Sequence, residues 1–121
     1  MTPAKYNISD SIHRGDTYPG RVIARLSYKD SGNPIEIVSG RMQLKYSFSD
    51  DIAYEWSTGN GKMTLYGETV NNEVILAPIA ASDTKDFKPG ILNYDLEVVT
   101  SEGKTWTVIY GTVSVTKDVT R

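Results

Sequence analysis

Cysteine is absent from this sequence of 121 residues, and histidine occurs once, as His13. Without thiols the chain can form no disulfide, no thiolate nucleophile and no zinc site built on cysteine. A single histidine offers little as a general base, and no serine lies in a Gly-x-Ser-x-Gly elbow. The sequence therefore predicts no catalytic residue, no metal site and no cofactor, and we expect a protein that is not an enzyme.

A strong charge of one sign and a long apolar run are also missing. Thirteen basic residues stand against fifteen acidic ones, for a net charge of −2 and a pI near 5.3. Because nucleic-acid-binding proteins normally carry a basic face, we expect no nucleic-acid partner. No run approaches the roughly 20 apolar residues of a membrane-spanning helix, and the first residues lack the apolar core of a secretion signal, so no membrane partner is expected.

Alternation of apolar and polar residues is what the sequence does contain. This period of two is typical of strands with one buried face, and it is clear in residues 21–28, 41–48 and 92–99. Turn residues interrupt it about every ten positions. Residues 80–88 lack this alternation, and we expect them to form a short helical turn or loop. The sequence predicts one domain over residues 1–121, an all-β antiparallel sandwich of about seven to nine strands, with a small closed barrel as the alternative.

The last third of the chain predicts the longest hairpin, from Ile91 to Thr116 around a turn at residues 101–104. A two-residue turn fixes a register in which inward residues meet inward residues. Tyr94 then lies opposite Gly111, where its ring is expected to cover the glycine. The other expected inward pairs are Leu92 with Val113, Leu96 with Ile109 and Val98 with Thr107. The expected core includes Leu44, Tyr46, Tyr54, Leu96 and Ile109.

The opposite face of this hairpin is the first candidate binding surface. The same register pairs Val99 with Trp106, Glu97 with Val108 and Asp95 with Tyr110. Val99, Trp106, Val108 and Tyr110 would then form an apolar cluster that points away from the core, and aromatic residues are favoured anchors of protein interfaces. The alternative is that a loop or the N-terminal arm covers this face.

The loop at residues 13–20 is the second candidate. It contains Arg14-Gly15-Asp16, the tripeptide that integrins recognise. Three residues are a short match, and a charged turn whose glycine takes an unusual φ is the favoured interpretation. Arg14 and Asp16 are kept as candidate protein-binding residues. The adjacent acids Asp50 and Asp51 lack the spaced oxygen ligands of a calcium loop.

Four segments carry a family resemblance: residues 12–17 (IHRGDT), 40–44 (GRMQL), 89–97 (PGILNYDLE) and 111–120 (GTVSVTKDVT). In this order they resemble the immunoglobulin-like N-terminal domains of bacteriophage baseplate upper proteins and of related tail-fibre and head-fibre proteins. The resemblance extends over nearly the whole chain. It implies an immunoglobulin-like β-sandwich that acts as a non-enzymatic virion module.

The resemblance also implies partners and a location. Those domains are usually followed by a linker and a receptor-binding or trimerising region, whereas this chain stops at Arg121. We therefore expect an accessory or decoration protein of the capsid, or a small tail adaptor. Its expected partners are other virion proteins and copies of itself, in the virion and in the host cytoplasm during assembly. Two other classes stay open: a carbohydrate-binding module that uses exposed Trp and Tyr, and an enzyme with a carboxylate-lined cleft.

Overall fold

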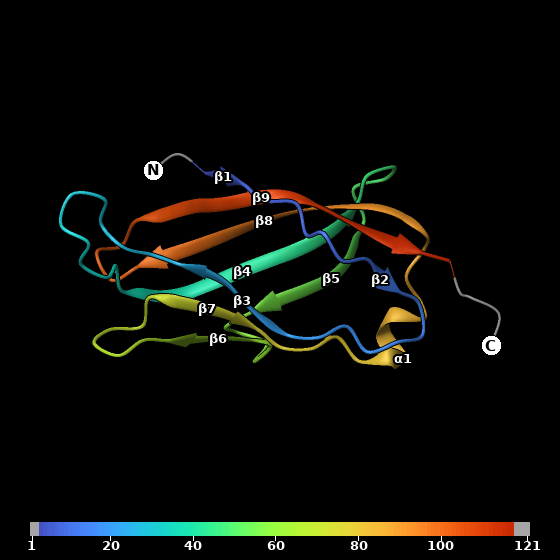
Figure 1. Cartoon of the computed structure of the whole chain (residues 1–121), viewed down its shortest axis with the longest axis horizontal. Helices are drawn as coiled ribbons and strands as arrows, with labels where there is room; N and C mark the ends of the chain where they lie inside the picture. Colours follow the sequence, from blue (N-terminus) through green and yellow to red (C-terminus); the bar gives the residue numbers. More distant parts are fainter. Residues whose placement is uncertain (1–2, 118–121) are drawn as a thin grey trace.

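Two β-sheets packed against each other make up the fold (Figure 1). The structure is a computed structural model that describes residues 3–117. The larger sheet has the order β1-β9-β8-β4-β5, with β2 also paired to β9, and the smaller has the order β3-β7-β6. The strands of the larger sheet are β1 (Ala4–Lys5), β2 (Ile12–His13), β4 (Ile37–Tyr46), β5 (Ile52–Ser57), β8 (Gly90–Thr100) and β9 (Thr105–Thr116). Those of the smaller are β3 (Arg21–Arg25), β6 (Met63–Tyr66) and β7 (Glu73–Leu76), and the helix is α1 (Ala81–Thr84).

This architecture confirms the predicted all-β sandwich, and the helix lies in the segment expected to form a helical turn. The strand pairs are antiparallel except at the N-terminus. Both β1 and β2 pair parallel with β9.

The core lies between the sheets and is filled by alternate residues of the long strands. From the larger sheet it takes Met42, Leu44, Leu92, Leu96 and Val98, all with no exposed surface. From the smaller it takes Val74, Leu76 and Met63. Of the expected core residues, Leu44, Tyr46 and Leu96 are buried, while Tyr54 and Ile109 are only half-buried at its edge.

Two contacts fix the sheets to each other. Trp56 of β5 is 1% exposed, and its indole N–H donates to the carbonyl of Ala77 after β7 over 2.9 Å. Gly40 of β4 lies against Met63 of β6, where an added Cβ would be only 2.8 Å from the Met63 sulfur. The tryptophan thus joins the sheets by a hydrogen bond, and the glycine lets them approach closely.

The hairpin of β8 and β9 follows the predicted register over most of its length and then departs from it. Leu92 pairs with Val113, Tyr94 with Gly111 and Leu96 with Ile109, as expected. The next pair is Glu97 with Thr107, because Val108 is an extra residue in β9. Such a β-bulge reverses which face the following residues occupy. The expected pairing of Val98 with Thr107 is therefore wrong, and Val98 pairs with Trp106.

The N-terminal segment crosses the hairpin at Gly111. The Tyr6 N–H donates to the Tyr110 carbonyl over 2.8 Å, and the Ile8 N–H donates to the Thr112 carbonyl over 3.0 Å. A Cβ on Gly111 would lie 1.8 Å from the Tyr6 carbonyl oxygen. The glycine therefore makes room for the backbone of Tyr6 rather than for the ring of Tyr94. Tyr94 instead donates its hydroxyl to that same carbonyl, and burial raises the pKa of Tyr94 to about 12.

A polar cluster ties this segment to the smaller sheet. The Arg21 guanidinium of β3 lies 2.8 Å from a carboxylate oxygen of Asp10 and 3.0 Å from the Tyr18 hydroxyl. The hydrogen bond from Arg21 lowers the pKa of Asp10, and burial raises the pKa of Tyr18 to about 12. The cluster closes the edge of the sandwich where the chain passes from one sheet to the other.

Candidate functional site

The outward cluster expected on the last hairpin does not form. Beyond the bulge, Trp106 lies opposite Val98 on the core side of β9, and Val99 pairs with Thr105 instead. Val108 is buried in the core, and Trp106 packs half-buried against it. Tyr110 is exposed on the other face. The four residues therefore do not share one surface, because the bulge turns Trp106 and Val108 inward.

The loop with Arg14-Gly15-Asp16 is a turn held against α1. Thr84 of the helix is fully buried; its hydroxyl donates to the Asp16 carbonyl over 2.7 Å and accepts from the Gly15 N–H over 3.1 Å. The Arg14 guanidinium donates to the Lys85 carbonyl over 3.0 Å. Gly15 has a φ of 84°, which confirms the expected unusual backbone. That Arg14 and Asp16 contact another protein stays a prediction.

A group of exposed apolar side chains lies at the end of the larger sheet where β4 ends and β5 and β8 begin. It consists of Phe48, Ile52 and Ile91, whose exposed fractions are 61%, 54% and 46%. Ile52 pairs with Lys45 on β4, and the neighbouring Ser47 N–H donates to the Ile91 carbonyl over 3.1 Å. These three side chains are called the end patch below.

An aromatic ring and charged side chains lie next to Phe48 and Ile52 of the end patch. The Phe48 ring stacks on the Tyr46 ring with centroids 5.2 Å apart, and the Lys88 ammonium lies 5.9 Å from each ring. Beside it is a cavity of about 300 Å³ lined by Ile52, by Asp83 of α1 and by Asp86, which follows the helix. An apolar centre with a charged rim is the usual anatomy of a protein interface.

The sequence did not point to this patch. Alternation along residues 41–48 predicts an inward side chain for Phe48, and this expectation is wrong. Phe48 lies beyond the end of β4, in a turn where Asp50 takes a φ of 61°. Ile52 is placed outward by a shift of register between Leu44 and Lys45. The Ser49-Asp50-Asp51 run was the signal that the strand ends before Phe48.

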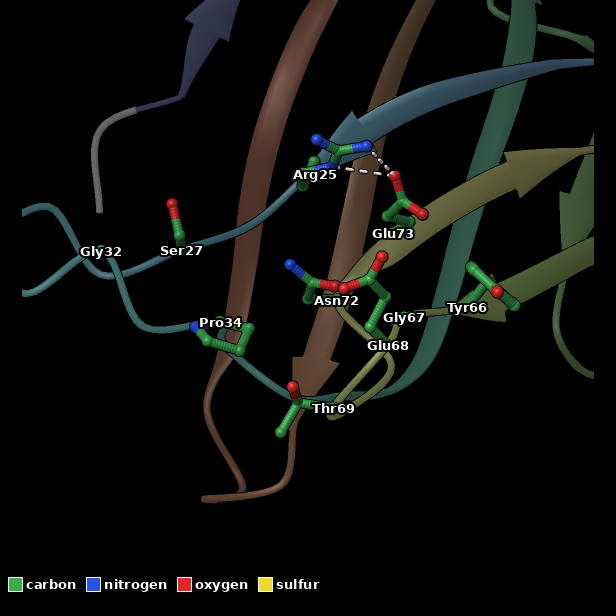
Figure 2. Close-up of a pocket in the computed structure, with 10 residues that line it drawn as sticks. All are labelled: Arg25, Ser27, Gly32, Pro34, Tyr66, Gly67, Glu68, Thr69, Asn72 and Glu73. Atoms are coloured by element: carbon green, nitrogen blue, oxygen red, sulfur yellow. Dashed lines mark hydrogen bonds and ion pairs between the residues drawn. The ribbon is translucent and has the colours of Figure 1, made fainter.

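A polar pocket of about 400 Å³ lies at the end of the smaller sheet (Figure 2). It opens between loop 27–34 and turn 67–72, at the point where β3 ends and β7 begins. Figure 2 shows the Arg25–Glu73 ion pair on one side, the Glu68 and Asn72 side chains beside it, and Tyr66 on the β6 side. None of these residues stands out in the sequence, because they meet only through the pairing of β3, β6 and β7.

Two further features, a cluster of metal ligands and a membrane-spanning helix, are absent from residues 3–117. No group of three or more His, Asp or Glu residues in this part of the chain is placed to hold a metal ion. No helix in it is long and apolar enough to cross a membrane. A comparison of the chain with protein-family models gives no match, and neither does a comparison with curated protein sequences.

Proposed function

We propose that the protein is a non-enzymatic structural component of a bacteriophage virion that docks on the capsid or tail through the end patch. Its partners are other virion proteins, with copies of itself as neighbours on the particle, and it resides in the virion after assembly in the host cytoplasm. The four resembling sequence segments support the virion role, and the immunoglobulin-like type of sandwich belongs to the same proposal. The exposure of Phe48, Ile52 and Ile91, all at the end of the larger sheet where β4 ends and β5 and β8 begin, is the observation that carries docking.

Exposed apolar surface favours association because its burial removes it from water, by roughly 25 cal/mol for each Å². Isolated apolar side chains are normal on a protein surface, whereas a group of them with an aromatic member often marks a binding site. The end patch is also held firmly, because Phe48 stacks on the buried Tyr46 and Ile52 lies within the β4–β5 ladder. A firmly held anchor loses little conformational entropy on binding.

The test is co-sedimentation of the protein with phage particles that lack their own copy of it. The double variant Phe48→Ser, Ile52→Ser should keep the melting temperature of the wild type within a few degrees and lose most of its binding. The matched control is Val22→Ser, Tyr66→Ser, which removes equally exposed side chains, 54% and 56%, from the smaller sheet. The control should bind like the wild type.

Binding of the end-patch variant at wild-type level would overturn the docking proposal. Cryo-EM of decorated particles gives an independent reading, because the end that carries turn 47–51 should face the shell. Truncation of a central aromatic anchor commonly costs about 2 kcal/mol or more, near thirtyfold in affinity, which co-sedimentation resolves.

A further inference from the structure

We propose that the polar pocket binds one unit of a neutral saccharide. The pocket lies on the smaller sheet, away from the end patch, so this function goes beyond docking. About 400 Å³ is the size of a small-molecule site and accommodates a single sugar ring with its hydroxyls.

Both hydrogen-bond donors and hydrogen-bond acceptors line the pocket. Arg25 donates through Nε, over 2.8 Å, and through one terminal nitrogen to the same oxygen of Glu73. The arginine side chain is 71% exposed, whereas that of Glu73 is 13% exposed. The pair therefore holds the guanidinium in place, and the exposure of the arginine side chain keeps its other terminal N–H groups accessible to a ligand. A fixed donor beside a fixed acceptor matches two neighbouring hydroxyls of a sugar.

The balance of charge favours a neutral ligand over an ion. The pocket contains one guanidinium, on Arg25, and two carboxylates, on Glu68 and Glu73. A phosphate would meet more negative than positive charge. A divalent cation would have to displace Arg25 from Glu73. A polyhydroxylated ligand without charge meets neither obstacle, and Ser27 and Thr69 add hydroxyls that can both donate and accept.

Tyr66 supplies an aromatic surface at the edge of the pocket. It ends β6 and pairs with Glu73 of β7, so its ring and the Arg25–Glu73 pair stand on the same outer face of the smaller sheet. Tyr66 is 56% exposed. Aromatic side chains combine an apolar face with a polar tip, which suits a sugar ring that has an apolar face of C–H groups and a rim of hydroxyls.

The walls of the pocket are already in place without a ligand. The side-chain amide of Asn72 donates to the Leu26 carbonyl over 3.1 Å, while the Leu26 N–H donates to the Asn72 carbonyl over 2.8 Å. These bonds join turn 67–72 to Leu26, the residue that precedes loop 27–34. Gly67 fits inside the turn because a Cβ there would lie 1.7 Å from the Val70 carbonyl oxygen. A site built in advance loses less free energy on binding.

The test is an NMR titration of the ¹⁵N-labelled full chain with glucose, galactose, mannose and N-acetylglucosamine, each up to tens of millimolar. At least one sugar should give saturable shifts confined to residues 25–34 and 66–73, with a Kd in the millimolar range that is usual for a single sugar unit. Tyr66→Ala and Arg25→Ala should each weaken that binding at least tenfold. Tyr110→Ala, which truncates an exposed tyrosine of the larger sheet, should leave it unchanged.

Three results would overturn the proposal: no saturable shift with any of the four sugars, equal binding by the wild type and Tyr66→Ala, or saturable shifts with inorganic phosphate or calcium alone. The last would make the pocket an ion site. Since Arg25 and Tyr66 are exposed, both variants should fold, and their melting temperatures check this. The particle-docking assay probes Phe48 and Ile52, so the two proposals can fail separately.

Discussion

Replacement of Gly111 by alanine tests how the N-terminal segment completes the larger sheet. Gly111 is not among the residues with positive φ, so alanine can adopt its backbone, and the effect of the change comes from the added methyl group. That group would lie 1.8 Å from the carbonyl oxygen and 2.6 Å from the carbonyl carbon of Tyr6. Backbone atoms cannot rotate away as a side chain can, so the segment must lift off β9.

The magnitude follows from the bonds that would break. Lifting the segment removes the Tyr6 N–H and Ile8 N–H bonds to β9, the bond from the Thr112 N–H to the Asn7 side chain, and the acceptor of the buried Tyr94 hydroxyl. Each is worth about 0.5–1.5 kcal/mol net, and part is recovered by hydration. We expect Gly111→Ala to lower the free energy of unfolding by about 2–4 kcal/mol.

Urea denaturation measures the loss, and hydrogen exchange at Tyr6 and Ile8 shows whether the segment has moved. Gly59→Ala is the matched control: it has no positive φ, and its nearest neighbour, the Ser57 hydroxyl, is 3.7 Å from the added Cβ. It should change stability by less than about 1 kcal/mol. In a chain without residues 1–7 the Gly111→Ala loss should also fall below about 1 kcal/mol. An equal loss with and without residues 1–7 would refute the clash with Tyr6.

Three other changes test the fold. Leu96→Ala removes a side chain with no exposed surface and should cost about 2–5 kcal/mol in urea denaturation, and a negligible loss would mean that Leu96 is not core. Trp56→Phe removes the hydrogen bond to Ala77 that joins the sheets and should cost about 1–3 kcal/mol, with no loss refuting its role. The pKa of Asp10 is lowered in the folded state, so its contribution is present above the unfolded pKa and is lost as pH falls through the folded pKa. Melting temperatures of wild type and Asp10→Asn should therefore converge as the medium is acidified below pH about 4, and a constant gap would contradict the pairing with Arg21.

The sequence predicted the parts of the fold that alternation controls. The pairs Leu92–Val113, Tyr94–Gly111 and Leu96–Ile109 could be assigned because apolar residues recur at every second position and a short turn fixes the register. The pattern fails at Val108 because a bulge adds one residue without changing the composition. Beyond the bulge, alternation therefore predicts the wrong face of the sheet for each side chain. It predicts an outward Trp106, although Trp106 packs on the core.

Neither candidate site could be read from the sequence, for a related reason. The end patch lies at strand ends and turns, where the alternation of apolar and polar residues stops. The direction of a side chain there, such as that of Phe48, depends on the local backbone conformation. The polar pocket joins Arg25 to Glu73, which are 48 positions apart in the chain. Only the register between β3 and β7 brings them together. The residues that flank these two strands give no signal of that pairing.

The two sites lie at opposite ends of the molecule. Figure 1 shows turn 47–51 and α1 at one end of the long axis, and loop 27–34 and turn 67–72 at the other. A chain that docks by the end patch would therefore hold the polar pocket away from the particle surface, open to sugars in the medium. Decorated particles should bind the sugar with the affinity of the free chain, measured as depletion of labelled sugar from solution. Loss of sugar binding on docking would mean that the pocket end, and not the end patch, faces the shell.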